Sequence, residues 1–473
     1  MKRDNIKIVP VEELKKQQVF VEGFRFLPDP PKTYHIVTYG CQMNTHDSEK
    51  LAGMLEKMGL THEPEKELAD FVLSNTCCIR DNAERKAVGN VHWQREIKKK
   101  RPNMLIGICG CMMEETSVIE KVQKNMKFVD IAFGTGNIHQ LPEILYNAVA
   151  NKTRCIKPSA VQSTMIEGLP VTREDKYHAY VTIMYGCDNC CTFCIVPYVR
   201  GKERSRNAED IVNDVRALVS DGVKEIMLLG QNVNSYGSDK TDNITFAKLL
   251  NMLEKTGIER IRFMTSHPKD LSDELIDEMK NNRALLPHFH LPVQSGSDHI
   301  LSRMNRRYTK ERFLERVESL RKAVPNIGLT TDFIVGFPGE TEEDFLETLD
   351  LAEKAQFQSA FTFIYSPREG TPAARMQDQV PANIAGERLR RLIELQERMT
   401  EKEMQKMLGV TEKVLVTGHS RRDGNMVTGK GERGLAVNFP GGHHEVGTVV
   451  PVKIISIGKT TLRGERIKEN YNV

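Results

Sequence analysis

Three cysteines stand close together near the middle of the chain with the spacing CxxxCxxC: Cys187, Cys191 and Cys194. Three thiolates can hold three irons of a 4Fe–4S cluster and leave the fourth iron open to an exogenous ligand. A structural zinc site is the alternative, but zinc normally takes four protein ligands, and the motif contains no histidine. Cys190 supplies a fourth nearby thiol outside the three-ligand spacing, so the zinc alternative stays open.

A second set of three cysteines is spread along the N-terminal part of the chain. Cys41, Cys77 and Cys111 each come directly after a short apolar segment that is predicted as a strand. Ligands bind where the carboxyl ends of parallel strands meet, so we expect the three thiolates to share one crevice and hold a second cluster. The alternative is three buried cysteines that act as small hydrophobic side chains. Cys78 and Cys109 alternate to the other side of their strand ends and are expected in packing.

The elements that must position this second set alternate between strand and helix. The predicted strands are YHIVTYG, DFVLSNT, MLIGICG and FVDIAFG. Strands separated by helices form right-handed βαβ units, so we expect a doubly wound parallel α/β domain over residues 32–150. Residues 1–31 are predicted as an N-terminal extension and residues 151–172, where periodicity is weak, as a linker.

A second series of strands and helices covers residues 173–408. The predicted strands are HAYVTIMYG, KEIMLLGQ, RIRFMTSH, HFHLPVQ, LTTDFIVG and SAFTFIYS. Six consecutive βα units predict a partial (βα)6 barrel, a truncated relative of the eight-fold barrel. The CxxxCxxC motif directly follows the first of these strands, on the face where barrel enzymes place their active sites.

Residues 409–473 have a different pattern, in which short alternating segments are separated by glycines. This pattern predicts an all-β module of about five strands that closes into a small barrel. From Thr411 onward the chain has ten Lys and Arg against six Asp and Glu, a balance of +4. A basic module is compatible with nucleic-acid binding, and an unevenly charged solvated surface is the alternative.

Composition narrows the class of protein. Apolar residues make up 39% and charged residues 28% of the 473, the balance of an ordinary globular protein, and this length predicts several domains. The first residues, MKRDNIKIVPVEELKKQ, lack the apolar region of a secretory signal, and no run of apolar residues approaches a membrane span. We therefore expect a cytoplasmic protein without a membrane partner, whose ten cysteines are not paired in disulfides and whose crowding indicates metal binding by some of them.

A series of motifs follows in fixed order along the chain from about Pro31: YGCQMN, CGCM, YGCDNCCTFC, PYVRG, GQNVNSYG, LPVQSGSD, DFIVGFPGET and YSPREGTPA. This order resembles the radical S-adenosylmethionine (SAM) methylthiotransferases. Gln42-Met43-Asn44 after the first cysteine is similar to the branch that modifies N6-dimethylallyladenosine in tRNA. The resemblance implies a methylthiotransferase N-terminal domain, a radical SAM barrel and a C-terminal TRAM barrel that grips RNA.

The resemblance also implies the roles of the two cysteine sets. Cys41, Cys77 and Cys111 would hold an auxiliary 4Fe–4S cluster, and the three cysteines of CxxxCxxC would hold the radical-generating 4Fe–4S cluster. One molecule of SAM would methylate a sulfur on the auxiliary cluster. A second would yield the radical that activates C2–H of the adenosine 3′-adjacent to the anticodon.

The expected partners are a tRNA anticodon stem-loop, a sulfur donor, and an electron donor such as a flavodoxin or ferredoxin. Two alternatives remain: a methylthiotransferase of the same family with another acceptor, and an RNA-binding protein whose cysteines hold structural zinc.

Several other residues are weaker candidates for binding SAM or the target base. Gln231, Gln294, Asp332 and Gly336 lie at the ends of predicted barrel strands, where polar groups often line a site. The Gly336 segment could equally be a turn. Phe193 lies between two ligands and could contact the adenine of SAM, with core packing as the alternative.

Three arginines are further candidates. Arg200 in PYVRG is predicted to contact the substrate, and a surface salt bridge is the alternative. Arg421 and Arg422 could hold RNA phosphates on the C-terminal module, with solvent exposure as the alternative.

Overall fold

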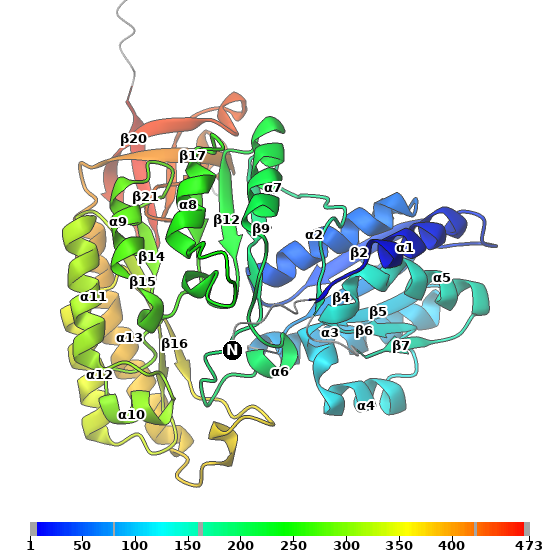
Figure 1. The fold of residues 1–473 in the computed structure, drawn as a ribbon, viewed down its shortest axis with the longest axis horizontal. Helices are drawn as coiled ribbons and strands as arrows, with labels where there is room; N and C mark the ends of the chain where they lie inside the picture. Colours follow the sequence, from blue (N-terminus) through cyan, green and yellow to red (C-terminus); the bar gives the residue numbers. More distant parts are fainter. Residues whose placement is uncertain (1–6, 79–80, 159–163, 421–422, 468–473) are drawn as a thin grey trace, which may run out of the picture.

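Three structural units follow one another along the chain, as Figure 1 shows: an N-terminal α/β unit, a strand–helix barrel and a small β-barrel. The computed structural model describes residues 7–78, 81–158, 164–420 and 423–467. This arrangement confirms the predicted fold class. Among the described residues, no helix is long and apolar enough to cross a membrane.

The N-terminal unit is built on a six-stranded, entirely parallel sheet in the order β3-β2-β4-β5-β6-β7. Its strands are β2 (Thr33–Thr38), β3 (Thr61–His62), β4 (Phe71–Thr76), β5 (Leu105–Gly110), β6 (Ile131–Phe133) and β7 (Cys155–Lys157). Every residue of β4 is buried, as expected for a central strand that is covered on both faces.

Helices cover both faces of this sheet, which makes the unit doubly wound. The helices are α1 (Val11–Phe24), α2 (Gln42–Lys57), α3 (Asp81–Lys100), α4 (Thr116–Asn125) and α5 (Leu141–Asn151). One apolar core joins the sheet to α1, α2 and α5, and a second joins its other face to α3 and α4. Helix α1 and strand β7 lie in stretches predicted as an extension and a linker, so the α/β unit uses more of the chain than the periodicity indicated.

The central unit is an open barrel of six parallel strands. They are β9 (His178–Thr182), β12 (Glu225–Leu229), β13 (Arg260–Phe263), β14 (His288–His290), β15 (Gly328–Val335) and β16 (Ser359–Ile364). The ladders run β13-β12-β9 and β14-β15-β16, and a parallel bridge between Ile261 and Leu285 links the two groups. The predicted partial (βα)6 barrel is therefore confirmed.

Amphipathic helices surround this barrel; the short helix Asp298–Arg303 packs in a smaller apolar cluster, and the others pack on one continuous core. They are α7 (Ala208–Ser220), α8 (Phe246–Glu254), α9 (Asp273–Asn281), α10 (Asp298–Arg303), α11 (Lys310–Ala323), α12 (Glu342–Ala355) and α13 (Ala382–Gln405). The side chains of Ser272, Thr309 and Thr341 accept backbone N–H groups at helix starts, which explains why those helices begin there.

The C-terminal unit is a closed five-stranded barrel in the order β17-β18-β19-β21-β20. Its strands are β17 (Thr411–His419), β18 (Met426–Lys430), β19 (Ala436–Pro440), β20 (Val449–Ile457) and β21 (Thr461–Arg466). It docks on the amino-terminal ends of the central strands, where the Arg260 and Arg262 guanidinium groups donate to its backbone carbonyls. Both arginines also bind Glu225, so a buried ion cluster fixes this junction.

Candidate active site

The cysteines of the N-terminal set lie at the ends of three adjacent strands. Cys41 precedes α2 after β2, Cys77 follows β4, and Cys111 begins the short 3-10 helix η1 (Cys111–Glu114) after β5. Strands β2, β4 and β5 are neighbours in the sheet. The expectation that topology brings these residues to one edge therefore agrees with the strand order.

Two glycines allow the three strand ends to approach one another closely. Gly40 and Gly110, which directly precede Cys41 and Cys111, both have positive φ angles, 107° and 99°. A Cβ on Gly40 would overlap the Cys77 side chain, and one on Gly110 would overlap the Thr76 carbonyl. Only glycine fits these positions, because any side chain would force the cysteine-bearing loops apart.

Asn44, in the first turn of α2, lies between two of the cysteines. Its Oδ1 atom is 4.0 Å from Cys41 Sγ and 3.8 Å from Cys111 Sγ. Its Nδ2 atom donates to the carbonyls of Tyr39 and Thr76, at 2.9 and 2.8 Å. The amide thus ties α2 to two loops that carry cysteines.

Arg200 reaches this set from the central unit. It follows α6 (Val196–Val199), the short helix that lies between the two units in Figure 1 and contacts η1. Its Nε donates to Cys111 Sγ at 3.1 Å, and its two terminal nitrogens donate to Asp47 and Asn44 at 3.0 and 2.9 Å. Arg200 is only 7% exposed, so the alternative of a surface salt bridge is wrong.

The thiols of this set differ in their acidity. A hydrogen bond from Cys77, helped by the Arg200 charge, outweighs burial and lowers the pKa of Cys41 to about 6. A hydrogen bond from Cys78 and the same guanidinium lower the pKa of Cys111. Thiolate is the form that binds iron, so these surroundings favour the ligand state.

Two further cysteines, Cys109 and Cys78, lie in different surroundings. Cys109 points into the apolar core beneath the sheet, which agrees with the packing prediction, and burial raises the pKa of its thiol. Cys78 is buried in an apolar cluster, as the packing prediction expects, but it does not turn away from the N-terminal set. Cys78 is hydrogen-bonded to Cys111, an interaction that raises the pKa of Cys78, and both lie in one apolar cluster.

The CxxxCxxC set lies in a single loop after β10 (Met184–Tyr185). Burial raises the pKa values of Cys187 and Cys194 to about 12. The buried Arg306 guanidinium lies 3.5 Å from Cys191 Sγ. Cys190 is exposed and has a positive φ of 49°, so its side chain does not share the burial of its neighbours.

Backbone bonds hold this loop against the barrel. The N–H of Cys187 donates to the Gly201 carbonyl at 3.2 Å, and the N–H of Thr192 donates to the Met304 carbonyl at 3.1 Å. The Asn305 side chain donates to the Cys190 carbonyl at 3.0 Å. In the part of the chain that the structure describes, no three His, Cys, Asp or Glu side chains are placed to hold a single metal ion.

Three of the candidate residues lie within or just beyond later barrel strands. Asp332 Oδ2 lies 3.5 Å from His290 Nε2, and Gln294 has a positive φ of 73° and bonds through its backbone to β15. Gln231 is half-buried just beyond β12, next to Asn232, whose Oδ1 is buried without a hydrogen-bond partner among described residues. Roles for these residues in binding SAM or the base stay predictions.

Phe193 and Gly336 lie in packed surroundings. The Phe193 ring meets the Phe337 ring edge-on at 6.3 Å, within an apolar cluster. Gly336 has a φ of 68°, and a Cβ there would overlap the Ala385 side chain on α13. The geometry therefore agrees with packing and turn roles, and cofactor contacts stay predictions. Arg421 and Arg422 lie outside the described residues.

Sequence reasoning missed Asn44, Asp47 and Arg306. For the first two a signal existed, because Cys41, Asn44 and Asp47 recur every three residues and so share one face of the helix that follows the cysteine. Arg306 gave no such signal, since it is far from the motif in sequence and contacts Cys191 only through the folding of the barrel.

Comparison with known proteins gives three family matches. The Uncharacterized protein family UPF0004 matches residues 33–134, the Radical SAM superfamily residues 181–352 and the TRAM domain residues 405–467. A tRNA-2-methylthio-N(6)-dimethylallyladenosine synthase of Thermoanaerobacter sp. (strain X514) is 50% identical over 462 residues, covering 97% of this chain and 98% of that protein. The chain belongs to the tRNA-2-methylthio-N(6)-dimethylallyladenosine synthase family.

Two more synthases of the family support this assignment. Those of Caldicellulosiruptor saccharolyticus and Alkaliphilus oremlandii are 48% and 46% identical, covering 97% and 99% of this chain and 96% and 100% of their own. The radical SAM methyltransferase TsrM from Kitasatospora setae, solved with cobalamin and a 4Fe–4S cluster, has a TM-score of 0.52 at 13% identity. It covers 72% of this chain and 77% of its own, and this likeness shows the fold alone.

The family and superfamily matches fix the class of chemistry. The protein is a radical SAM methylthiotransferase, and its cofactors include an iron–sulfur cluster and SAM.

Proposed function

We propose that the protein adds a methylthio group to C2 of N6-dimethylallyladenosine, 3′-adjacent to the anticodon in tRNA. The names of relatives that match over nearly the whole chain support this acceptor. We further propose two 4Fe–4S clusters, one held by Cys41, Cys77 and Cys111, the other by the CxxxCxxC cysteines. Bound there, the clusters and SAM supply the sulfur, the methyl group and the 5′-deoxyadenosyl radical.

One observation carries this proposal: a short segment joins the two cysteine sets. Cys194 is followed by α6 and then by Arg200, whose Nε is 3.1 Å from Cys111 Sγ. The segment between the sets therefore spans only a few residues, and α6 packs on η1. A reaction that needs a radical at one centre and a sulfur at the other requires both centres to face one substrate.

The surroundings of the N-terminal set fit an iron–sulfur cluster. The lowered pKa values of Cys41 and Cys111 favour thiolates. Burial opposes the charge of Arg200, but Cys111 and Asp47 outweigh it and raise its pKa well above the ordinary value. Arg200 therefore stays a cation that balances the negative charge of thiolate ligands.

Two elements could receive the RNA. Phe361 and Phe363 lie on the same face of edge strand β16 and are 49% and 37% exposed. Exposed aromatic rings are the usual stacking platform for an unpaired base. The C-terminal barrel is proposed to bind the anticodon stem-loop, with phosphate contacts by Arg421 and Arg422, while a flavodoxin or ferredoxin supplies electrons and a separate donor supplies sulfur.

The test is an anaerobic reaction with a synthetic anticodon stem-loop that carries N6-dimethylallyladenosine, together with SAM, sulfide and dithionite. Mass spectrometry of the digested RNA should show a nucleoside that has gained one methylthio group in place of hydrogen. A matched stem-loop with unmodified adenosine should stay unchanged. Equal modification of both RNAs, or 5′-deoxyadenosine without any sulfur-containing nucleoside, would contradict the proposed acceptor.

A further inference from the structure

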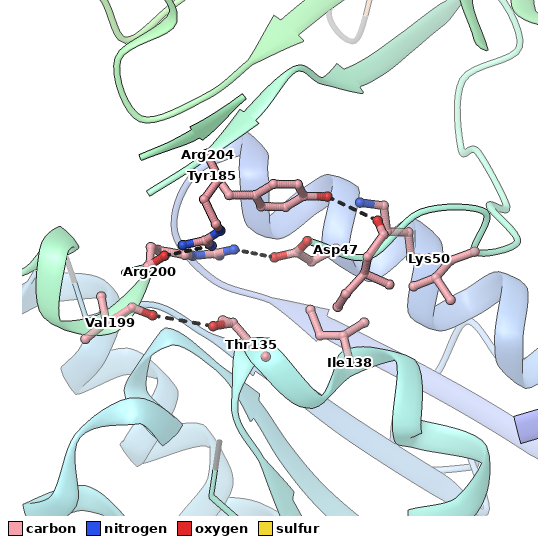
Figure 2. Close-up of a pocket in the computed structure, with 11 residues that line it drawn as sticks. Asp47, Lys50, Thr135, Ile138, Tyr185, Val199, Arg200 and Arg204 are labelled. Carbon is pink, nitrogen blue, oxygen red and sulfur yellow. Dashed lines mark hydrogen bonds and ion pairs between the residues drawn. The ribbon is translucent and has the colours of Figure 1, made fainter. Parts of the chain in front are cut away.

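A small cavity lies beside the N-terminal cysteine set, at the junction between the α/β unit and the central barrel. Its volume is about 40 Å³, enough for a few water-sized molecules. Figure 2 shows its lining, which comes from both units: Asp47, Lys50, Thr135, Gly136, Ile138, Ile166, Leu169, Tyr185, Val199, Arg200 and Arg204. Asp47 and Arg200 belong to the set of contacts around Cys111, so the cavity and the cysteines share a wall.

The charge of this lining is unbalanced. Lys50, Arg200 and Arg204 contribute three cations, whereas Asp47 is the only acidic residue among the lining side chains. Asp47 is already engaged by Arg200 at 3.0 Å. The cavity therefore has two buried cations that no carboxylate in its wall neutralises.

Of these buried cations, Lys50 has the fewest polar contacts. Its side chain is buried, with the residue 9% exposed, and its ammonium makes no hydrogen bond or ion pair with any described residue. The Tyr185 ring centroid lies 6.0 Å from its Nζ, and the neighbouring Glu49 carboxylate, which is hydrogen-bonded to His46, attracts the ammonium without contacting it. An ammonium taken out of water without a counter-ion costs free energy that an anion in the cavity would offset.

Arg204 adds an independent observation. It is 7% exposed, and its Nε is buried without a hydrogen-bond partner among the described atoms. Its terminal nitrogens donate to the carbonyls of Lys202 and Arg200, at 2.7 and 3.1 Å, and not to a carboxylate. In Figure 2 Lys50 lies on one side of the Asp47–Arg200 pair and Arg204 on the other, with Tyr185 above.

We propose that this cavity is a binding site for a small sulfur anion, hydrosulfide, on its way to the N-terminal cysteine set. The ligand class follows from the charge and the size: two cations that no carboxylate of the cavity wall contacts favour an anion, and the volume excludes an RNA segment or a whole SAM molecule. The assignment to sulfur rests on the proposed function, which requires a sulfur atom to reach the centre next to Arg200. The proposal concerns binding only and includes no covalent step.

The first test uses bromide as a probe of the site. Crystals of the cluster-loaded protein, grown without oxygen and soaked in sodium bromide, should show an anomalous peak in the cavity beside Lys50 Nζ. Sodium hydrosulfide should displace that peak. Lys50→Met should abolish it, and Lys50→Arg, which keeps the charge, should retain it. Lys57→Met is the matched control, because Lys57 lies on the same helix but is exposed.

The second test separates binding of sulfur from an adventitious halide. In methylthio transfer with sodium hydrosulfide as sulfur source, Lys50→Met should raise the KM for sulfide at least about tenfold, as expected for loss of a charge-assisted contact. The kcat at saturating sulfide should stay close to that of Lys57→Met.

Each outcome decides between these possibilities. Absence of a bromide peak in the unaltered protein would overturn the site. A bromide peak combined with an unchanged KM for sulfide would mean an adventitious ion only and would overturn the sulfur assignment. If no variant, including the unaltered protein, makes any methylthio product, the proposed function fails while the bromide result still decides whether the cavity binds anions.

Discussion

The two cysteine sets each contain three cysteines, but the chain brings them together in different ways. Cys187, Cys191 and Cys194 occupy one loop after one strand, whereas Cys41, Cys77 and Cys111 come from the ends of three neighbouring strands. The loop set depends on local spacing, and the strand-end set depends on the whole parallel sheet. The first is therefore a property of a short motif, and the second is a property of a fold.

The surroundings differ in the same way. The strand-end set has two cysteines with lowered pKa values and a buried network of Asn44, Asp47 and Arg200. In the loop set, burial raises the pKa values of Cys187 and Cys194, and the Arg306 guanidinium lies beside Cys191. A centre that must bind SAM through an open iron needs free space, while a centre that stores sulfur benefits from charge held in place by the protein.

The largest expected effect follows from breaking the loop set. Cys191→Ala removes one of the three proposed ligands, so radical generation and methylthio transfer should both fall below detection. The measurement is 5′-deoxyadenosine and modified nucleoside from the same reaction. Cys155→Ser, which alters a half-buried cysteine on β7, is the control for loss of a thiol. Cleavage of SAM at the normal rate by Cys191→Ala would contradict the proposal that the loop set generates the radical.

A selective effect is expected from the strand-end set. Cys41→Ala should abolish the methylthio product, yet 5′-deoxyadenosine should still form, because the loop set is intact. Iron content should drop from about eight to about four per chain. Loss of both products in this variant would mean that the two centres cannot be separated functionally.

The sequence predicted the loop set and the strand-end set alike, but for different reasons. The CxxxCxxC motif can be recognised within eight consecutive residues. Cys41, Cys77 and Cys111 were found because each follows a β-strand pattern, and parallel topology brings such ends together. The contact of Arg200 with Cys111 was not predictable, since it joins two units whose relative placement is set by side-chain packing, such as Met43 against Met227 and Leu229.

Arg200→Gln should affect the strand-end set and leave the loop set unchanged. It leaves Asp47 buried without its cationic partner, a loss of about 3–5 kcal/mol for a broken buried pair, and it removes the donor to Cys111. We expect a changed EPR signal from the strand-end cluster, reduced product and near-normal 5′-deoxyadenosine. Arg200→Lys should recover part of the stability, because it keeps the charge. Unchanged spectra of both clusters would show that Arg200 has no influence on the centre.

The smallest effect on chemistry is expected far from both sets, at the junction with the C-terminal barrel. Burial favours neutral Glu225, but Arg262 and Arg260 outweigh it and lower the pKa of Glu225 to about 2. Glu225→Gln leaves both arginines buried without a counter-charge and should destabilise the fold by about 3–5 kcal/mol at pH 7. Both cluster signals should persist.

The pH dependence provides the control for that variant. A carboxyl whose pKa is lower in the folded state than its unfolded value near 4.3 stabilises the fold above that value and loses its contribution as pH falls towards 2. The difference in thermal unfolding midpoint between the unaltered protein and Glu225→Gln should therefore stay nearly constant from pH 7 to about pH 5 and narrow as the pH falls from there towards 2. A constant gap would mean that the charge of Glu225 is not what holds the junction.

The proposed chemistry depends most directly on the number of clusters. Iron, acid-labile sulfide and zinc should be measured on the protein purified and reconstituted without oxygen. We expect about eight irons per chain with matching sulfide, as two four-iron clusters require. About four irons would leave the strand-end cysteines as thiols without a cluster, and zinc in place of iron would contradict radical chemistry at either centre.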